Sequence, residues 1–183
     1  IMPIRKKDGD AKMLLARCEE LRETLTNSGI RVKVDMRQEP SVGRRFNEWE
    51  VKGVPIRMEI GERELSSDTV VLARRDTGEK VTVGRKEIIT TVQKLLIDIQ
   101  ESLFEKAKTF LHTNTYSAAT YDEFKTIMSS TRGFIRALWC EDAACEAKIK
   151  EETKASTRCL PMNPKEEKGT CVHCGKPAIH RWL

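Results

Sequence analysis

Apolar and polar residues recur with two different periods along the first part of the chain, and the change of period predicts its elements. Apolar residues at helical spacing predict one helix that ends at Gly29, with Asp8 and Asp10 as N-cap candidates; its apolar face carries Leu14, Leu15, Cys18, Leu21 and Leu25. Strict alternation predicts strands at 30–34, 54–60, 69–73 and 80–83, and a short helix is expected at 41–52. Strands interleaved with helices predict a mixed sheet with helices packed on it.

A long amphipathic helix is expected from Lys86 to Leu111, where apolar residues recur every three or four positions. These apolar residues extend over fewer than four heptads, so they predict a helix whose apolar face packs on the sheet rather than a coiled coil. The polar stretch 112–120 then breaks the pattern, which places the expected domain boundary between domains 1–115 and 116–183. In the second domain the pattern predicts a helix after Tyr121, a strand at 134–139, a helix at 142–154, a strand near 158–160 and a final strand at 178–183.

Composition narrows the class of protein. The 183 residues are 39% hydrophobic and 33% charged, with a net charge of +5, which is enough apolar material for a core and indicates an anionic partner. No apolar run reaches the length of a membrane span, and no signal-like segment or lipidation motif is present, so we expect a soluble cytoplasmic chain without a membrane partner. Six cysteines in such a chain are expected to be free thiols or metal ligands.

The motif CVHC, with Cys171 and Cys174, is open to metal binding, to redox chemistry or to no role at all. A second pair upstream, Cys140 and Cys145, would complete a closed tetrahedral zinc site of the structural kind. The redox alternative needs the motif to open a helix, which the Gly and Pro that follow it disfavour. His173 is an alternative ligand, whereas Cys18 and Cys159 are expected to be buried inert thiols.

No catalytic constellation is present, so the sequence predicts a binding module. Between Arg31 and Arg57 lie seven basic and four acidic residues together with Phe46 and Trp49. Single-stranded RNA binding uses aromatic rings for stacking and cations for phosphates, and Glu50 beside Arg57 would suit the edge of a guanine. The alternative is a helix that packs both rings on the sheet while its charges are solvated.

The stretch from Ser41 to Gly61, SVGRRFNEWEVKGVPIRMEIG, resembles the anticodon-binding domain of prolyl-tRNA synthetases of the archaeal and eukaryotic type. The resemblance extends over essentially the whole chain and implies an α/β fold: a mixed five-stranded sheet flanked by helices, followed by a small zinc-binding α/β domain. It implies that Phe46 stacks on an anticodon base, and that Glu50 and Arg57 recognise the two guanines of proline anticodons. It implies a zinc ion on the four paired cysteines, and places Arg63 and Lys80 near the anticodon.

The resemblance also implies a larger enzyme, a proline–tRNA ligase that uses ATP and Mg²⁺ to activate proline and then aminoacylates tRNA(Pro). Its catalytic domain, with the class II motifs, is not part of this sequence, so we expect a C-terminal portion of a homodimeric enzyme with no catalytic residues of its own. Two alternatives remain at this point. One is a stand-alone zinc-containing module, a synthetase paralogue, that binds RNA or protein; the other is a thiol oxidoreductase.

Overall fold

The computed structural model describes residues 1–5 and 11–183, which form two compact units, Ile1–Lys106 and Ala107–Leu183. The expected N-cap residues Asp8 and Asp10 lie outside the described residues. The division between the units falls inside the long helix α4 (Ile88–Thr113), and each unit is described by itself below.

The first unit is built on a mixed sheet with the strand order β1-β2-β3-β4. Strand β1 (Met2–Pro3) runs parallel to β2 (Ile56–Ile60), while β3 (Thr69–Arg74) pairs antiparallel with β2 and with β4 (Lys80–Gly84). The strands expected at 54–60, 69–73 and 80–83 are therefore confirmed to within two residues.

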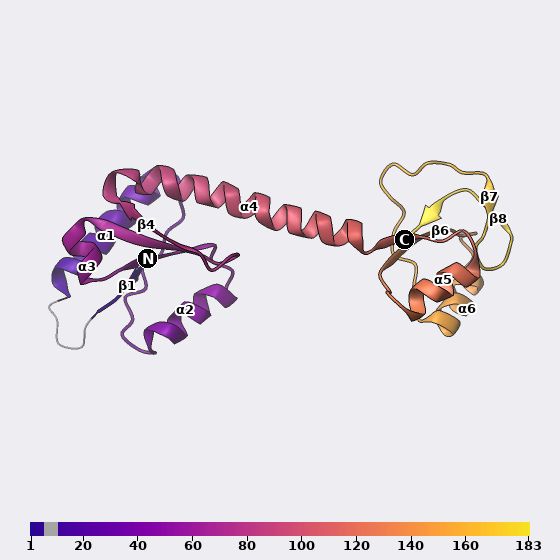
Figure 1. Ribbon diagram of the computed structural model, residues 1–183, viewed down its shortest axis with the longest axis horizontal. Coiled ribbons are helices and arrows are strands. Elements are labelled where there is room, and N and C mark those ends of the chain that lie inside the picture. Colours follow the sequence, from indigo (N-terminus) through magenta and orange to yellow (C-terminus); the bar gives the residue numbers. More distant parts are fainter. Residues whose placement is uncertain (6–10) are drawn as a thin grey trace. The chain divides into compact units, whose positions relative to one another are not determined.

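Helices α1 (Lys12–Asn27) and α4 cover one face of this sheet, and α2 (Val42–Val51) lies on the other side of it (Figure 1). The short helix α3 (Glu62–Ser67), which the periodicity did not predict, follows β2 directly. The core lies between α1, α4 and the sheet, and its buried members are Leu14, Cys18, Leu21, Leu25, Met58, Ile60, Val70, Leu72, Val83, Ile88 and Val92. Cys18 is fully buried, as expected, and burial raises the pKa of its thiol to about 11.

The segment expected as a strand at 30–34 is extended but does not join a ladder, so that prediction is wrong. Its alternating apolar residues do pack on the core. Its backbone, however, pairs with no strand of the described sheet. Ile30 donates to the Leu25 carbonyl in α1 (3.0 Å), while Ile1 donates to the Lys33 carbonyl (2.7 Å) and accepts from the Asp35 amide (2.9 Å). The two hydrogen bonds with Ile1 do not make a strand pair, so the described part of the sheet has four strands rather than the expected five.

The second unit is a small α/β lobe. Strand β6 (Phe134–Leu138) lies between β5 (Thr115–Ser117), which is parallel to it, and β9 (Arg181–Trp182), which is antiparallel. Helix α5 (Tyr121–Ser129) begins with a capping box formed by Thr120 and Glu123, and α6 (Ala143–Thr153) begins with the Asp142 side chain as its N-cap. A separate pair, β7 (Gly169–Thr170) and β8 (Pro177–Ala178), carries the CVHC loop between its strands.

Three predictions for this unit are wrong. The segment near 158–160 forms no strand; Cys159 exchanges backbone hydrogen bonds with Leu183, but its thiol is exposed rather than buried. The final strand expected at 178–183 is divided between β8 and β9, which pair with different partners. Within the described residues, no helix is both long and apolar enough to span a membrane.

Candidate nucleic-acid interface and metal centre

Strand β2 divides its side chains between the core and an open polar face. Met58 and Ile60 are buried against the helices, so the alternation of a strand turns Arg57 and Glu59 to the opposite face. Arg57 lies opposite Ala73 of β3, and Ala73 lies opposite Lys80 of β4. The sheet register therefore places three charged residues of two strands on the face that α2 flanks.

Arg57 is the hub of this face. Its guanidinium carbon lies 3.9 Å from the centre of the Phe46 ring, and its Nη1 donates to Glu50 Oε1 at 2.5 Å. On its other side, Nε donates to Glu59 Oε1 at 3.0 Å, and Lys80 Nζ donates to Glu59 Oε2 at 2.9 Å. We call these five residues, Phe46, Glu50, Arg57, Glu59 and Lys80, the arginine cluster.

The arginine cluster has the chemistry to recognise a base by its edge and its face. Carboxylate oxygens accept hydrogen bonds from ring and amino N–H groups, and a guanidinium donates to carbonyl and ring nitrogen acceptors. Because Arg57 already covers one face of the Phe46 ring, a stacking base has to use the rest of the ring.

The structure brings Phe46, Glu50, Arg57 and Lys80 together, but Arg63 lies elsewhere. Arg63 is in α3, beyond the opposite end of β2 from Arg57, and its side chain is exposed. Among the described residues, no ion pair joins it to the arginine cluster. Glu59 was missed by sequence reasoning, although its spacing of two from Arg57 on one strand was a signal for a shared face.

A second network holds α2 in place through Asp35. The Asp35 carboxylate accepts from Trp49 Nε1 (2.7 Å) and from Arg37 Nη2 (2.7 Å), and it lies 3.6 Å from Nη1 of the buried Arg45. Hydrogen bonds from Arg37, followed by the one from Trp49, hold the pKa of Asp35 far below its usual range although burial opposes them. Trp49 therefore acts as an anchor for α2, while Lys33 and Lys52 lie over its ring.

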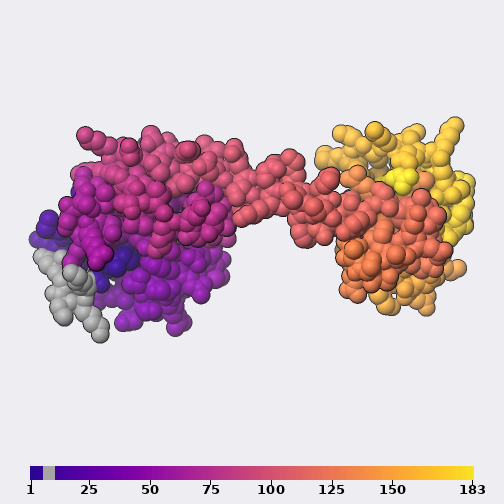
Figure 2. All heavy atoms as spheres, viewed as in Figure 1, coloured from indigo at the N-terminus to yellow at the C-terminus, as the bar shows by residue number. Residues whose placement is uncertain are grey.

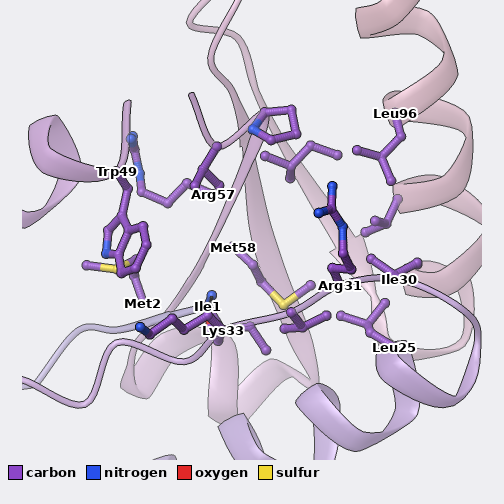
Figure 3. Close-up of a pocket in the computed structure, with 15 residues that line it drawn as sticks. Ile1, Met2, Leu25, Ile30, Arg31, Lys33, Trp49, Arg57, Met58 and Leu96 are labelled. Atoms are coloured by element: carbon purple, nitrogen blue, oxygen red, sulfur yellow. Dashed lines mark hydrogen bonds between the residues drawn. The ribbon is translucent and has the colours of Figure 1, made fainter. Parts of the chain in front are cut away.

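A cavity of about 290 Å³ lies between the extended segment 30–33 and β2. Figure 3 shows Trp49 and Arg57 at one end of it and Met58 below, with Leu25 and Leu96 on the far side. Its lining is mainly apolar, so it does not offer the carboxylate pattern of the arginine cluster.

The four paired cysteines converge in the second unit. Cys140 follows β6, Cys145 lies in the first turns of α6, and Cys171 and Cys174 follow β7. Their sulfur atoms all lie within 4.8 Å of one another, with Cys140 and Cys174 at 3.5 Å and Cys145 and Cys171 at 3.7 Å. A tetrahedral zinc ion with bonds of about 2.3 Å requires sulfur atoms about 3.8 Å apart, so these side chains fit a metal ion.

The backbone of the CVHC loop favours a thiolate at Cys171. Burial raises the pKa of Cys171, but the backbone N–H groups of Cys174 and His173 outweigh that effect and lower it to about 7. Gly175 has a φ of 72°, the left-handed conformation that lets the loop turn back, and its N–H donates to the Cys171 carbonyl (3.1 Å). Four sulfur atoms at one point do not form the isolated dithiol that a redox role requires.

Comparison with known families agrees with this geometry. The family model for the anticodon binding domain matches residues 1–95, more than half of the chain, so the chain belongs to this family. A second family model, for the C-terminal domain of prolyl-tRNA synthetase, matches residues 121–183. The resemblance to prolyl-tRNA synthetases predicted from the sequence is confirmed.

The curated relatives that match almost the whole chain are named proline–tRNA ligases. A proline–tRNA ligase of Clostridium novyi is 44% identical over 181 residues, which is 98% of this chain and 37% of the relative. Those of Natranaerobius thermophilus and Cytophaga hutchinsonii are 43% and 42% identical over 96% and 100% of this chain. The chain thus spans only 36–37% of the length of these relatives.

Proposed function

We propose that this chain is the anticodon-recognising and metal-stabilised part of a proline–tRNA ligase. In the whole enzyme, residues outside this chain would bind ATP and Mg²⁺, activate proline and aminoacylate tRNA(Pro). The two domains, 1–115 and 116–183, would contribute recognition and rigidity but no catalytic residue. A cytoplasmic, homodimeric enzyme is part of this proposal, as the resemblance of the sequence to prolyl-tRNA synthetases implies.

The arginine cluster is the observation that carries the proposal. Phe46 would stack on an anticodon base, while Glu50 and Arg57 would pair with the edges of the two guanines. Arg57 is already held between Glu50, Glu59 and the Phe46 ring, so little side-chain entropy remains to be lost when RNA binds. Glu50 has a second carboxylate oxygen for a base.

Lys80 and Arg63 would play different parts in this interface. Lys80 is bound to Glu59 inside the arginine cluster, which supports a contact with the anticodon itself. Arg63 is exposed in α3, so we assign to it a phosphate contact further along the tRNA.

The metal proposed for Cys140, Cys145, Cys171 and Cys174 is zinc in a structural role. All four positions of a tetrahedral ion would be filled by sulfur, which leaves no site for a water or a substrate. Such an ion would stabilise a lobe whose buried clusters are small. The two family models and the named relatives that match the chain favour a synthetase over a stand-alone interaction module.

Substitution of Glu50 or Arg57 by Ala tests the anticodon assignment. Each change should weaken binding of tRNA(Pro) by about 1–3 kcal/mol, because it removes a paired contact to a base edge. The measurement is the affinity of the 183-residue chain and its variants for tRNA(Pro) and for a transcript with a swapped anticodon. Both affinities are measured at one salt concentration and compared. Both variants should lose most of the preference for the native anticodon.

Lys94→Ala is the matched control, because Lys94 is exposed on α4, across the sheet from the arginine cluster. It should weaken the binding of both transcripts slightly and to the same extent, as expected for the loss of one distant positive charge. If Glu50→Ala and Arg57→Ala retained the wild-type preference for the native anticodon, the assignment would be overturned.

A further inference from the structure

His173 lies between two ligands of the proposed metal site but points to a third. Its ring Nδ1 is 3.3 Å from Sγ of Cys145, a residue 28 positions earlier in the chain. Its side chain is only 15% exposed. The imidazole is therefore packed inside the lobe rather than placed at random on the surface of the CVHC loop.

The geometry gives His173 a place outside the ligand set. Among the described residues, the group of side chains that could hold a metal at this point consists of the four cysteines alone. A metal-bound thiolate has no proton and can only accept, so Nδ1 has to carry the hydrogen that lies between the ring and Cys145. The contact is then an N–H to sulfur hydrogen bond.

Two side chains from other elements hold the ring in this orientation. The Tyr121 ring, at the start of α5, meets the imidazole edge to face with the ring centres 4.8 Å apart. Glu152, near the end of α6, lies 3.8 Å from Nε2 through Oε1. The Tyr121 hydroxyl donates to Oε2 of the same carboxylate at 2.9 Å, which fixes the carboxylate in turn.

We propose that His173 is a positioning residue of the metal site: its Nδ1–H holds the Cys145 thiolate, and Tyr121 and Glu152 hold its ring. The inference rests on the proposed zinc site. Partners that hydrogen-bond to a metal ligand fix its orientation, and their loss costs about 10- to 100-fold in metal affinity. The contact also withdraws charge from the Cys145 sulfur and lowers its reactivity toward alkylating agents.

The test is the rate at which the zinc-loaded 183-residue chain transfers zinc to a colorimetric chelator. His173→Ala should release zinc about 10- to 100-fold faster than wild type. His173→Asn keeps an N–H donor near the position of Nδ1 and should stay within a few-fold of wild type. His173→Gln carries its donor near the position of Nε2 and should behave like His173→Ala.

Tyr121→Phe supplies a second measurement, because it removes only the hydroxyl that fixes Glu152. It should speed zinc release less than His173→Ala does. His112→Ala is the control, since His112 is an exposed histidine near the end of α4 and should leave the rate unchanged. Alkylation of Cys145, followed by peptide mass spectrometry, should be faster in His173→Ala and near wild type in His173→Asn.

Equal release from wild type and His173→Ala would overturn the proposal while leaving the zinc site intact. A His173→Ala chain that retains as little zinc as Cys174→Ser would make His173 a ligand, which also overturns it. A wild-type chain that binds no zinc would overturn both this inference and the proposed metal.

Discussion

Asp35 ties helix α2 to the segment that precedes it. Its side chain is 2% exposed, and that of Arg45, which faces it, is 4% exposed. Trp49 and Arg45 both belong to α2, so one carboxylate from the preceding segment holds the helix that carries Phe46 and Glu50. Removing the negative charge would leave the Arg45 guanidinium buried without its compensating anion.

Asp35→Asn should lower the free energy of unfolding by about 3–5 kcal/mol at pH 7, the cost of breaking a buried ion pair from one side. The folded-state pKa of Asp35 lies below its unfolded value, so this stabilisation is present above about pH 4 and is lost as pH falls through the folded pKa. Urea unfolding at several pH values should show that wild type and variant differ in their free energy of unfolding, and that this difference shrinks progressively as the pH falls below about 4.

Glu101→Gln is the matched control, because Glu101 is exposed on α4, and it should unfold like wild type at every pH. If the free energies of unfolding of wild type and Asp35→Asn differed by the same amount from pH 7 to pH 3, the proposed role of the Asp35 charge would be contradicted. Asp76 also loses its stabilising charge in acid, since its hydrogen bond with Arg74 lowers its pKa to about 2, but both chains share that effect.

Individual site residues were predictable to different degrees. Phe46 and Glu50 stood out in a basic segment with few aromatic residues, but nothing local distinguished Asp35 from the solvated acids near it. Its role depends on a tryptophan 14 positions away and on burial, which are properties of the folded chain. The cysteine pairs were predictable because metal ligands have a characteristic spacing; their convergence needed the structure.

At the scale of elements, periodicity predicted helices better than strands. Helices α1, α2, α4, α5 and α6 follow the expected ranges because a helix satisfies its backbone within one segment. A strand needs a partner, and alternation says nothing about one. The segments 30–34 and 158–160 alternate correctly, yet neither belongs to a strand of the described sheets; their long-range backbone hydrogen bonds go to Ile1 and Leu183. Short elements such as α3 and β5 hold too few residues to show any period.

Gly133 marks the entry to β6, and its replacement tests the pairing of that strand. It has a φ of 126°, and a Cβ atom there would lie 2.5 Å from the carbonyl oxygen of Asn114. The same carbonyl accepts the Phe134 amide at 2.8 Å, so it cannot move away without loss of that bond. Gly133→Ala should lower the melting temperature and cost at least about 1–3 kcal/mol of stability.

Gly43→Ala is the comparison for that measurement. Gly43 lies inside α2, and a Cβ atom there would meet no neighbour within 4 Å. The change should stabilise the chain by about 0.5–1 kcal/mol, because alanine loses less conformational freedom in a helix. Similar shifts in melting temperature for Gly133→Ala and Gly43→Ala would mean that the contact with Asn114 does not constrain Gly133.

At the scale of the whole molecule, the two units depend on different sources of stability. The first has one continuous core from α1 across the sheet to α4. The second has two smaller buried clusters, one of which contains Cys145 and Cys171 themselves. Stability of the second unit should therefore depend on the proposed zinc far more than stability of the first does.

Removal of zinc by a chelator should raise amide hydrogen exchange in peptides from residues 107–183 and leave those from 1–106 unchanged. Added zinc should restore protection, because the ion contributes its binding energy only to the lobe that holds it. Cys171→Ser should resemble the chelated chain, and Cys159→Ser, which alters an exposed cysteine outside the site, should resemble wild type. Equal loosening of both units would contradict this division.

The proposed metal ligands come in two pairs that flank residues 154–168, a stretch without helix or strand in which Met162 is 99% exposed. With an ion bound to both pairs, the chain between Cys145 and Cys171 becomes a closed ring. Covalent continuity along the exposed residues 162–166 is then redundant, since the ion joins the two sides of a break there. A protease cut, an insertion or a deletion within 162–166 would cost the lobe little for as long as the metal stays in place.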